Sequence, residues 1–439
     1  MTTTFIAQAD NIIKNKNLQV QEFLEKWKAY GAVSTPQEIV NLMIAIAGIK
    51  RWYNLDILEP ACGFCNFLFG IYIKFPYNNF TGIEINKEIF QKNKSLFSNL
   101  PFNLIREDFL LYKTDKKYDL IIGNPPYGII GDQTHYPIYT LKQQKDKYKR
   151  ILNTWFGKYN IYGAFIEKGV SLLKDKGVLI YIIPATWMVL DEFGRLRKFL
   201  SCLGKTRVYY LGKDVFKGVS VSVCILAFEK DGKGAQLYLK ENNTFIKSAS
   251  FPNWRGEVLT FENKATIKLR EGKILLGEVF DIKISARSTE VKNFGKVLSR
   301  PQKDSLPFMN GRNIKRGIIE RKNYTHLWLS PKETLNLKKF YGILPRIVIG
   351  HTKGGKIVAA QENFGYPYVG DVYHLLPKVK LNKSVLKEIV DWLNSDEINK
   401  YVKTLYKDIT PHITTTQLKA LPLKLKTKIN TEDLFRLCH

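Results

Sequence analysis

Cysteine is scarce in this sequence. The five cysteines, Cys62, Cys65, Cys202, Cys224 and Cys438, are odd in number and widely scattered. Small domains held by disulfides carry denser, paired cysteines, so the pattern excludes a disulfide framework and fits a reducing cytosol. Cys62 and Cys65 form one Cys-x-x-Cys pair with no second pair at zinc spacing, and the six histidines show no ligand spacing. We therefore read the pair as loop lining and predict no metal site.

Long apolar runs are also missing. No uninterrupted hydrophobic stretch reaches the length of a membrane-spanning helix. The first ten residues lack the basic start and apolar core of a signal peptide. The sequence therefore predicts a cytoplasmic protein with no membrane partner.

Acidic residues are in deficit. The 439 residues include 68 Lys and Arg against 40 Asp and Glu, a formal net charge of +28. An extended polyanion is the usual partner of such a surface, although a generally lysine-rich proteome would give the same excess. Residues 1–234 carry a net charge of +11 and residues 235–439 carry +17, so the second part is the more basic. This distribution favours a nucleic-acid reader in the second part of the chain.

The order of the secondary-structure patterns predicts two domains. Ser34-Thr35-Pro36 carries the signal of a helix start, with polar cap candidates and an early proline, and a helix is expected over residues 37–46. Strand patterns then alternate with helical patterns, which predicts an α/β fold with a Rossmann-like, doubly wound and mostly parallel sheet. The expected strands are 55–58, 80–83, 102–105, 119–122, 178–183, 207–211 and 219–228. The polar, glycine-containing run 229–234 predicts a boundary, giving a catalytic domain over residues 1–234 and an α+β domain over residues 235–439.

The tetrapeptide Asn124-Pro125-Pro126-Tyr127 is the most informative motif. It follows a buried-strand pattern and so falls at the carboxyl end of a strand, where open α/β sheets bind ligands. An exocyclic adenine amine is a poor nucleophile because its lone pair is delocalised into the ring. Two acceptors facing its N–H bonds, the Asn124 side-chain oxygen and the Pro125 carbonyl, would free that lone pair to attack a methyl group. Two consecutive prolines stiffen the loop, and Tyr127 offers a face on which a flat base can stack.

Residues at the ends of three other predicted strands together predict a cofactor pocket. Glu59, Pro60, Ala61 and Cys62 form a small-residue turn without the phosphate-binding glycine pattern, which suits a nucleoside cofactor without phosphates. Glu84, followed by Ile85, is spaced to accept hydrogen bonds from ribose hydroxyls. Asp108 can accept from an adenine amine and Phe109 can cover the ring. Each has an ordinary alternative as a solvated strand end, helix cap or core residue, but together they predict a site for S-adenosyl-L-methionine.

On these residues the chain resembles the γ-class DNA adenine-N6 methyltransferases of the TaqI type, over nearly its whole length. Residues 31–40, with Thr35, look like the family's cofactor motif before the first strand, and residues 59–62 and 124–128 match its first and fourth motifs. Phe165 matches a position lining the cofactor. Phe216 resembles the second aromatic that holds a flipped adenine against Tyr127, although a lone Phe is more often a core residue. Cys65 departs from the family, which usually has Gly there, and Gly63 stands nearby.

The resemblance implies an S-adenosylmethionine-dependent, site-specific enzyme that methylates N6 of a flipped-out adenine in double-stranded DNA. It implies the target 5′-TCGA-3′, action as a monomer, and a place as the modification half of a prokaryotic restriction-modification system. The cognate endonuclease would then be a separate chain that is not required for activity. The implied DNA contacts are Arg287, Arg312, Lys353 and Pro411, with Pro411 entering the space left opposite the extruded base.

The polar, glycine-containing segment 129–136 follows the active-site motif. We predict that it is a mobile loop that becomes ordered when DNA binds.

Two alternative readings stay open. A methyltransferase acting on RNA or on a protein glutamine could use the same tetrapeptide, but such enzymes do not usually carry a large basic domain after the catalytic one. A cytosine-N4 enzyme would more often have Ser at position 124. The second alternative is a DNA-binding protein with a degenerate catalytic fold, against which the intact Asn124, Glu84 and Asp108 argue.

Overall fold

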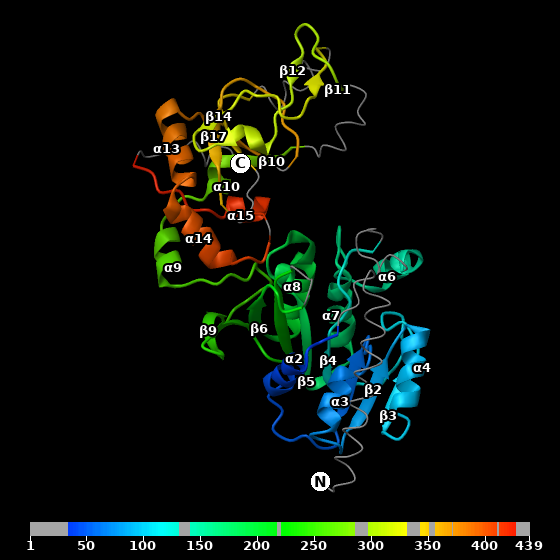
Figure 1. Ribbon diagram of the computed structural model, residues 1–439. Coiled ribbons are helices and arrows are strands. Elements are labelled where there is room, and N and C mark those ends of the chain that lie inside the picture. Colours follow the sequence, from blue (N-terminus) through cyan, green and yellow to red (C-terminus); the bar gives the residue numbers. More distant parts are fainter. Residues whose placement is uncertain are drawn as a thin grey trace. The chain divides into compact units, whose positions relative to one another are not determined.

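The computed structural model describes residues 34–130, 141–216, 221–285, 297–331, 343–350, 356–370, 372–410 and 412–426. The chain folds into two compact units, Met1–Thr260 and Phe261–His439 (Figure 1). In the described part of the chain, no helix is long and apolar enough to cross a membrane.

The first unit is built on one large mixed sheet. Its nine described strands are β1 (Asp56–Pro60), β2 (Asn79–Ile83), β3 (Phe102–Ile105), β4 (Tyr118–Gly123), β5 (Leu173–Pro184), β6 (Gly204–Gly212), β7 (Val223–Lys230), β8 (Ala235–Glu241) and β9 (Thr244–Phe251). They lie in the order β3-β2-β1-β4-β5-β7-β6-β8-β9. The strands from β3 to β5 are mutually parallel, and β7 pairs antiparallel with both β5 and β6. The predicted doubly wound, mostly parallel fold is therefore confirmed.

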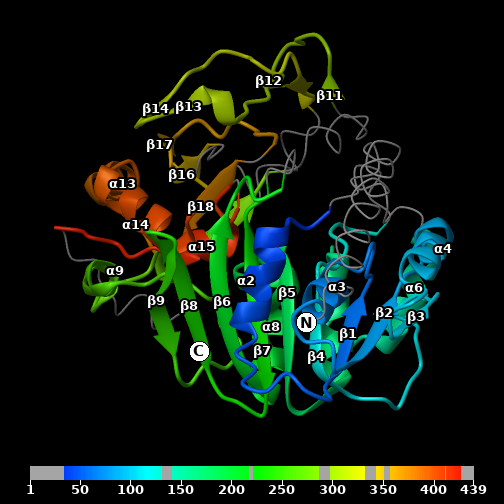
Figure 2. The same ribbon diagram turned by 60° about the horizontal axis from the view of Figure 1, so that its bottom comes forward.

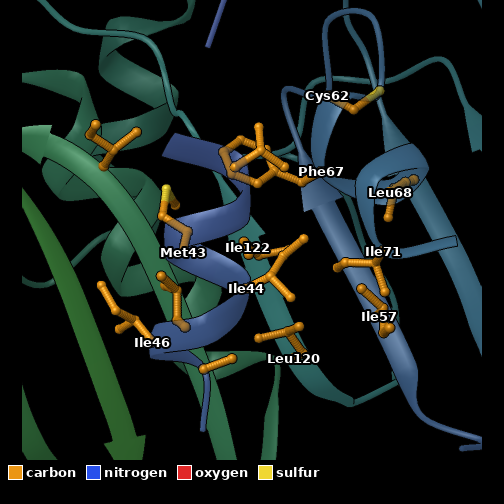
Figure 3. Close-up of a cluster of buried hydrophobic side chains, with 14 of the residues drawn as sticks. Met43, Ile44, Ile46, Ile57, Cys62, Phe67, Leu68, Ile71, Leu120 and Ile122 are labelled. Atoms are coloured by element: carbon orange, nitrogen blue, oxygen red, sulfur yellow. The ribbon is translucent and has the colours of Figure 1, made fainter. Parts of the chain in front are cut away.

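Helices cover this sheet because its strands carry apolar side chains on both faces. The described helices are α2 (Gln37–Ile46), α3 (Asn66–Tyr72), α4 (Lys87–Leu96), α6 (Lys145–Ile151), α7 (Ile161–Ser171) and α8 (Gly194–Leu203), with short 3₁₀ turns at η2 (Lys142–Gln144), η3 (Ala185–Met188) and η4 (Asp191–Phe193). In Figure 2, α2 crosses in front of the strands. Figure 3 shows Met43 and Ile44 of α2 in one buried cluster with Leu120 and Ile122 of β4 and with side chains of α3.

The opposite face of the sheet is packed by α7. A Cβ atom built on Gly169 would lie 2.5 Å from Leu179 Cδ1 and 2.9 Å from Tyr181 Oη, so α7 lies directly on β5. Leu179 and Tyr181 alternate with Ile180 and Ile182, which belong to the α2 cluster. This alternation is the period of two that separates the faces of a strand.

The first unit extends further along the chain than the sequence predicted. The polar run 229–234 was expected to be a domain boundary, but residues 229 and 230 end β7, and residues 231–234 join it to β8 within the same sheet. β8 pairs parallel with β6, and β9 pairs with β8. The compact unit consequently ends at Thr260.

The second unit is an α+β assembly, as predicted. Its described strands are β10 (Phe280–Ile284), β11 (Val297–Leu298), β12 (Leu306–Pro307), β13 (Ile314–Lys315), β14 (Ile318–Ile319), β15 (Trp328–Leu329), β16 (Arg346–Ile349), β17 (Ala359–Glu362) and β18 (Tyr373–Pro377). In the part of this unit that the structure describes, the helices are α9 (Lys264–Arg270), α10 (Leu276–Val279), η5 (Gly311–Asn313), α13 (Lys383–Leu393), α14 (Asp396–Tyr406) and α15 (Thr415–Lys419). The central sheet has the order β10-β18-β16-β17 and is antiparallel throughout.

Charged and polar side chains are buried within this central sheet. Arg346 on β16 and Glu362 on β17 are cross-strand partners, and neither is exposed to solvent. Glu362 accepts a hydrogen bond from Tyr368 Oη at 2.6 Å. On β18, His374 Nε2 lies 2.7 Å from Ser285 Oγ. Burial, and then the nearby Arg346 charge, lower the pKa of His374 to about 3, so its imidazole is neutral at physiological pH.

The neutral state of His374 predicts a loss of stability in acid. In the unfolded chain the imidazole takes up a proton near its ordinary pKa of about 6.5. Between about pH 6.5 and pH 3 the unfolded chain thus binds more protons than the folded one, and stability falls as pH falls. At pH 5.5 this linkage costs about 1.4 kcal/mol relative to pH 7.5.

Urea unfolding of the wild type and of His374→Gln at the two pH values measures this effect. We expect the difference between the two proteins to shrink by about 1.4 kcal/mol on going to pH 5.5. A difference that does not change with pH would contradict a neutral, buried His374.

Candidate active site

The loops after β1 and β4 leave the sheet from neighbouring parallel strands. Asn124 follows directly on Gly123, the last residue of β4. A Cβ atom at Gly123 would lie 3.4 Å from the carbonyl oxygen of Pro60, the last residue of β1. The two loops that the sequence assigned to chemistry and to cofactor binding therefore share one edge of the sheet, where parallel strands place their carboxyl ends.

The side-chain amide of Asn124 is held from one side only. Its Nδ2 donates to Thr35 Oγ1 at 3.2 Å. Its Oδ1 is inaccessible to solvent and has no hydrogen-bond partner among the residues that the structure describes. Leaving a buried acceptor without a donor costs about 1–3 kcal/mol. Such an atom is suited to receive a donor from a ligand.

Thr35 does not cap α2, although the sequence named it as a cap candidate. The sequence offered Ser34 and Thr35 as cap candidates for α2, but the N-terminus of α2 has no side-chain cap, and Pro36 occupies the N-cap position. The Thr35 hydroxyl instead accepts the Asn124 amide from a position 89 residues away in the chain. Thr35 is buried, so water does not compete strongly for this contact.

Tyr127 is fixed at both its hydroxyl and its ring. Its hydroxyl donates to the carbonyl oxygen of Ile182 at 2.9 Å, and its ring meets Tyr162 edge-on at 6.3 Å. Burial raises the pKa of Tyr127 well above its ordinary value, so the phenol stays protonated and keeps this bond. Between Asn124 and Tyr127, Pro125 and Pro126 have no N–H and restrict the loop.

Phe216 is a core residue in this structure. It is 3% exposed and belongs to the buried cluster against which Tyr127 packs. The structure therefore brings the two predicted base-holding aromatics to the same cluster. Their predicted action as a sandwich around a base stays a prediction.

The loop after β1 has a strained backbone. Ala61, Gly63 and Cys65 all have positive φ, of 50°, 50° and 53°. Residues other than glycine lose roughly 1–2 kcal/mol in this region, and such strain concentrates at functional sites. Cys65 therefore adopts the left-handed conformation that a glycine would favour at its position, so the departure from the family pattern does not remove the turn.

Three side chains hold this loop in place. Glu59 accepts from the backbone N–H of Phe67 at 3.4 Å and of Leu68 at 2.9 Å, and so caps α3 from within β1. Glu84 Oε2 accepts from the Gly63 N–H at 2.9 Å. Asn93 Nδ2 donates to the Gly63 carbonyl at 2.6 Å. Glu59, predicted to contact the cofactor, thus makes contacts that shape the loop.

Glu84 and Ile85 follow directly on Ile83, the last residue of β2. Both carboxylate oxygens of Glu84 accept backbone N–H bonds, from Gly63 and from Asn86. Burial raises the pKa of this carboxyl, and the backbone N–H groups of Asn86, Gly63 and Ile85 oppose that rise. The next side chain, Ile85, is 48% exposed. An apolar side chain that lies open beside a buried acceptor is suited to one face of a bound nucleoside.

Asp108 is held by a residue that the sequence did not single out. Its Oδ1 accepts from the Leu110 N–H at 2.9 Å, and its Oδ2 accepts from Tyr148 Oη at 2.5 Å. Burial, with the neighbouring Asp108, raises the pKa of Tyr148. Phe109 packs against Phe165, with ring centroids 5.1 Å apart. No local pattern marks Tyr148, because it reaches Asp108 across 40 positions of sequence.

Of the four predicted DNA contacts, the structure describes Arg312, which is exposed in η5. Arg287, Lys353 and Pro411 lie outside the described residues, as does most of the predicted mobile loop 129–136. Within the described ranges, no group of three or more His, Cys, Asp or Glu side chains is placed to hold a metal ion. The Sγ atoms of Cys62 and Cys65 lie 3.5 Å apart in the core.

Comparison with known proteins supports both units. Residues 50–216 match the family model of the Eco57I restriction-modification methylase, and residues 306–423 match that of the TaqI-like C-terminal specificity domain. The chain is 40% identical over 413 residues to the Type II methyltransferase M.TthHB8I of Thermus thermophilus, covering 92% of this chain and 93% of that protein. It is 23% identical over 410 residues to the modification methylase CviBIII of Paramecium bursaria Chlorella virus NC1A, covering 91% and 95%.

A solved structure shares the fold. It is a nuclease-deletion mutant of the Type ISP restriction-modification enzyme LlaGI, determined with a DNA substrate mimic. The match has a TM-score of 0.51 at 14% identity and covers 88% of this chain and 55% of the other.

Proposed function

Because the chain belongs to the TaqI-like type II restriction-modification methyltransferases, we propose that it transfers a methyl group to N6 of a flipped-out adenine in duplex DNA. The proposed target is 5′-TCGA-3′, and the proposed role is the modification half of a restriction-modification system. The cognate endonuclease would be a separate chain that the reaction does not need.

One observation supports the proposal that the nucleophile is an amine. Asn124 Oδ1 is buried and has no partner among the described residues, while Thr35 holds the other end of the same amide. An N–H of the target amine donates to Oδ1, and its second N–H donates to the Pro125 carbonyl. These bonds draw the amine toward tetrahedral geometry and direct its lone pair at the methyl carbon. One N–C bond forms, one S–C bond breaks, and the methylated amine releases a proton to solvent.

S-adenosyl-L-methionine, the family's cofactor, supplies an electrophilic methyl group on a sulfonium that leaves readily. The residues at the strand ends fit such a nucleoside. A side chain at Gly63 would meet no atom within 4 Å, so the loop has open space on that side. In this proposal Glu84 accepts from the ribose hydroxyls and Asp108 accepts from the adenine amine, with Ile85, Phe109 and Phe165 as apolar walls; Ile85 is exposed, and Phe109 packs against Phe165. Because the leaving group is good, most of the catalytic effect comes from positioning.

The target base must leave the helix to reach this site, which costs a few kcal/mol of stacking and pairing. Tyr127 repays part of this cost by stacking on the base. Its hydroxyl bond to Ile182 fixes the ring in advance, so little side-chain entropy is lost on binding. Phe216 would cover the second face of the base. Arg287, Arg312, Lys353 and Pro411 remain the proposed contacts of the specificity domain.

The direct test is transfer of label from S-adenosyl-L-methionine to two matched duplexes, followed by nucleoside analysis. One duplex contains TCGA, and the other has its adenine already N6-methylated. We expect N6-methyladenine from the first duplex alone. Label in other sequences would discard the target but keep the enzyme class. Cofactor binding without transfer to any DNA would favour RNA or protein as the substrate.

A substitution at Thr35 tests how the Asn124 amide is oriented. Thr35→Val keeps the shape of the side chain but removes the acceptor for Nδ2, so the amide can rotate away from its working orientation. We expect kcat to fall about tenfold, equivalent to about 1.4 kcal/mol. Thr35→Ser keeps the hydroxyl and should stay within about twofold of the wild type.

Cofactor affinity separates the two possible roles of Thr35. If Thr35 acts through Asn124, Thr35→Val binds S-adenosyl-L-methionine normally and is slow at saturating cofactor. A raised cofactor KM with unchanged kcat would instead make Thr35 a cofactor contact, and the orienting role would be wrong.

A further inference from the structure

We propose that residues 142–158, which comprise η2, α6 and the loop that follows α6, form a second DNA-contact surface in the catalytic unit. This surface binds the sugar-phosphate backbone beside the target nucleotide. This proposal rests on the proposed function, because it takes duplex DNA as the substrate. It adds a contact outside the specificity domain, and its ligand is the phosphodiester chain rather than the bases.

The first observation is charge. Residues 142–158 contain six basic residues and a single acidic one, Asp146. The basic side chains exposed to solvent are Lys142, Lys147, Lys149, Arg150 and Lys158. Lys149 lies 3.7 Å from Asp146 in a solvent-exposed pair of the kind that contributes little. No ion pair with another described residue neutralises Lys147 or Arg150.

The second observation is position. Lys145 Nζ donates to the carbonyl oxygen of Ile130 at 2.9 Å, three residues after Tyr127. At the far end of the segment, Asn160 Oδ1 accepts from the Gly128 N–H at 2.7 Å. The basic segment therefore both begins and ends against the residues that directly follow the active-site motif.

A third contact fixes α6 to the cofactor side of the same edge. Tyr148 is fully buried, and its hydroxyl donates to Asp108 Oδ2 at 2.5 Å. Tyr148 is buried, whereas its neighbours on α6, Lys147, Lys149 and Arg150, are exposed to solvent. The cations are thus held near the site by the protein's own hydrogen bonds.

In this proposal the ligands of these cations are the phosphates on either side of the target nucleotide. A flipped adenine stays covalently joined to both neighbouring nucleotides, so the flanking phosphates must lie beside the pocket that holds it. Phosphates contacted by Lys and Arg release counterions, which favours binding without reading sequence. Phe156 extends this surface: it is 51% exposed, and the Arg195 guanidinium lies over its ring at 5.0 Å. Such a pair suits an unstacked sugar or base next to the phosphates.

The test compares two triple variants that remove the same charge. The first is Lys147→Ala, Lys149→Ala and Arg150→Ala on α6. The control is Lys50→Ala, Arg51→Ala and Lys74→Ala, three exposed residues that precede β1 and β2 and so lie at the other end of the strands. Duplex binding is measured by fluorescence anisotropy over a range of KCl concentrations, with a non-reactive analogue of the cofactor present.

We expect the α6 variant to weaken binding at least tenfold at moderate salt, on a TCGA duplex and on an unrelated duplex alike. The slope of log affinity against log salt should fall by about 0.9 for each lost contact, or about 2.7 in all. Its urea midpoint and cofactor affinity should match the wild type. The control variant should keep the wild-type slope, affinity and methyl transfer.

An unchanged salt slope in the α6 variant would overturn the proposal, as would an equal loss in the control. These outcomes are distinguishable from failure of the proposed function. If the wild type methylates DNA and the α6 variant binds it normally, only the proposal of a second DNA-contact surface is wrong. If the wild type methylates no DNA, the proposed function itself fails.

Discussion

The amide of Asn124 is fixed at its nitrogen by Thr35, and its oxygen is buried without a donor among the described residues. This asymmetry determines what the site can do, because a carbonyl oxygen held in that way can bind an N–H group without first giving up another partner. Pro125 and Pro126 keep the loop from relaxing toward a competing donor. The strands β1 and β4 place this loop against the turn after Pro60, so that a methyl donor bound there would lie beside it. The rest of the first unit supports that juxtaposition.

The turn after β1, the proposed cofactor site, shows how backbone strain is held in place. Ala61 and Cys65 adopt left-handed conformations that other sequences would assign to glycine. The turn keeps this shape because Glu59 caps α3, and because Glu84 and Asn93 bind the two backbone groups of Gly63. Carboxylates are therefore used in two ways at this edge. Glu59 shapes the turn through its backbone contacts, whereas Glu84 both shapes the turn and lies beside the exposed Ile85.

Much of the fold follows from local pattern, as the agreement over residues 37–46 and 102–105 shows. The order of β6 and β7 was not predicted, although the strands differ in a visible way: β7 is apolar almost throughout, which suits a central strand, and β6 alternates. The run 229–234 looked like a linker because a tight turn and a linker share the same polar residues and glycine. The sequence could not predict that Thr35 holds Asn124 or that Tyr148 holds Asp108. These partners are distant in sequence, and only the folded sheet brings them together.

The central claim is that Asn124 acts on the reacting amine and not on binding. Single-turnover methyl transfer by Asn124→Ala, measured with cofactor and duplex affinities for the same protein, tests it most directly. The account predicts that transfer falls by roughly a hundredfold or more, as for loss of an oriented acceptor in a preorganised site, while both affinities stay within about threefold of the wild type. Transfer within about tenfold of the wild type, or a loss explained entirely by weaker binding, would contradict it.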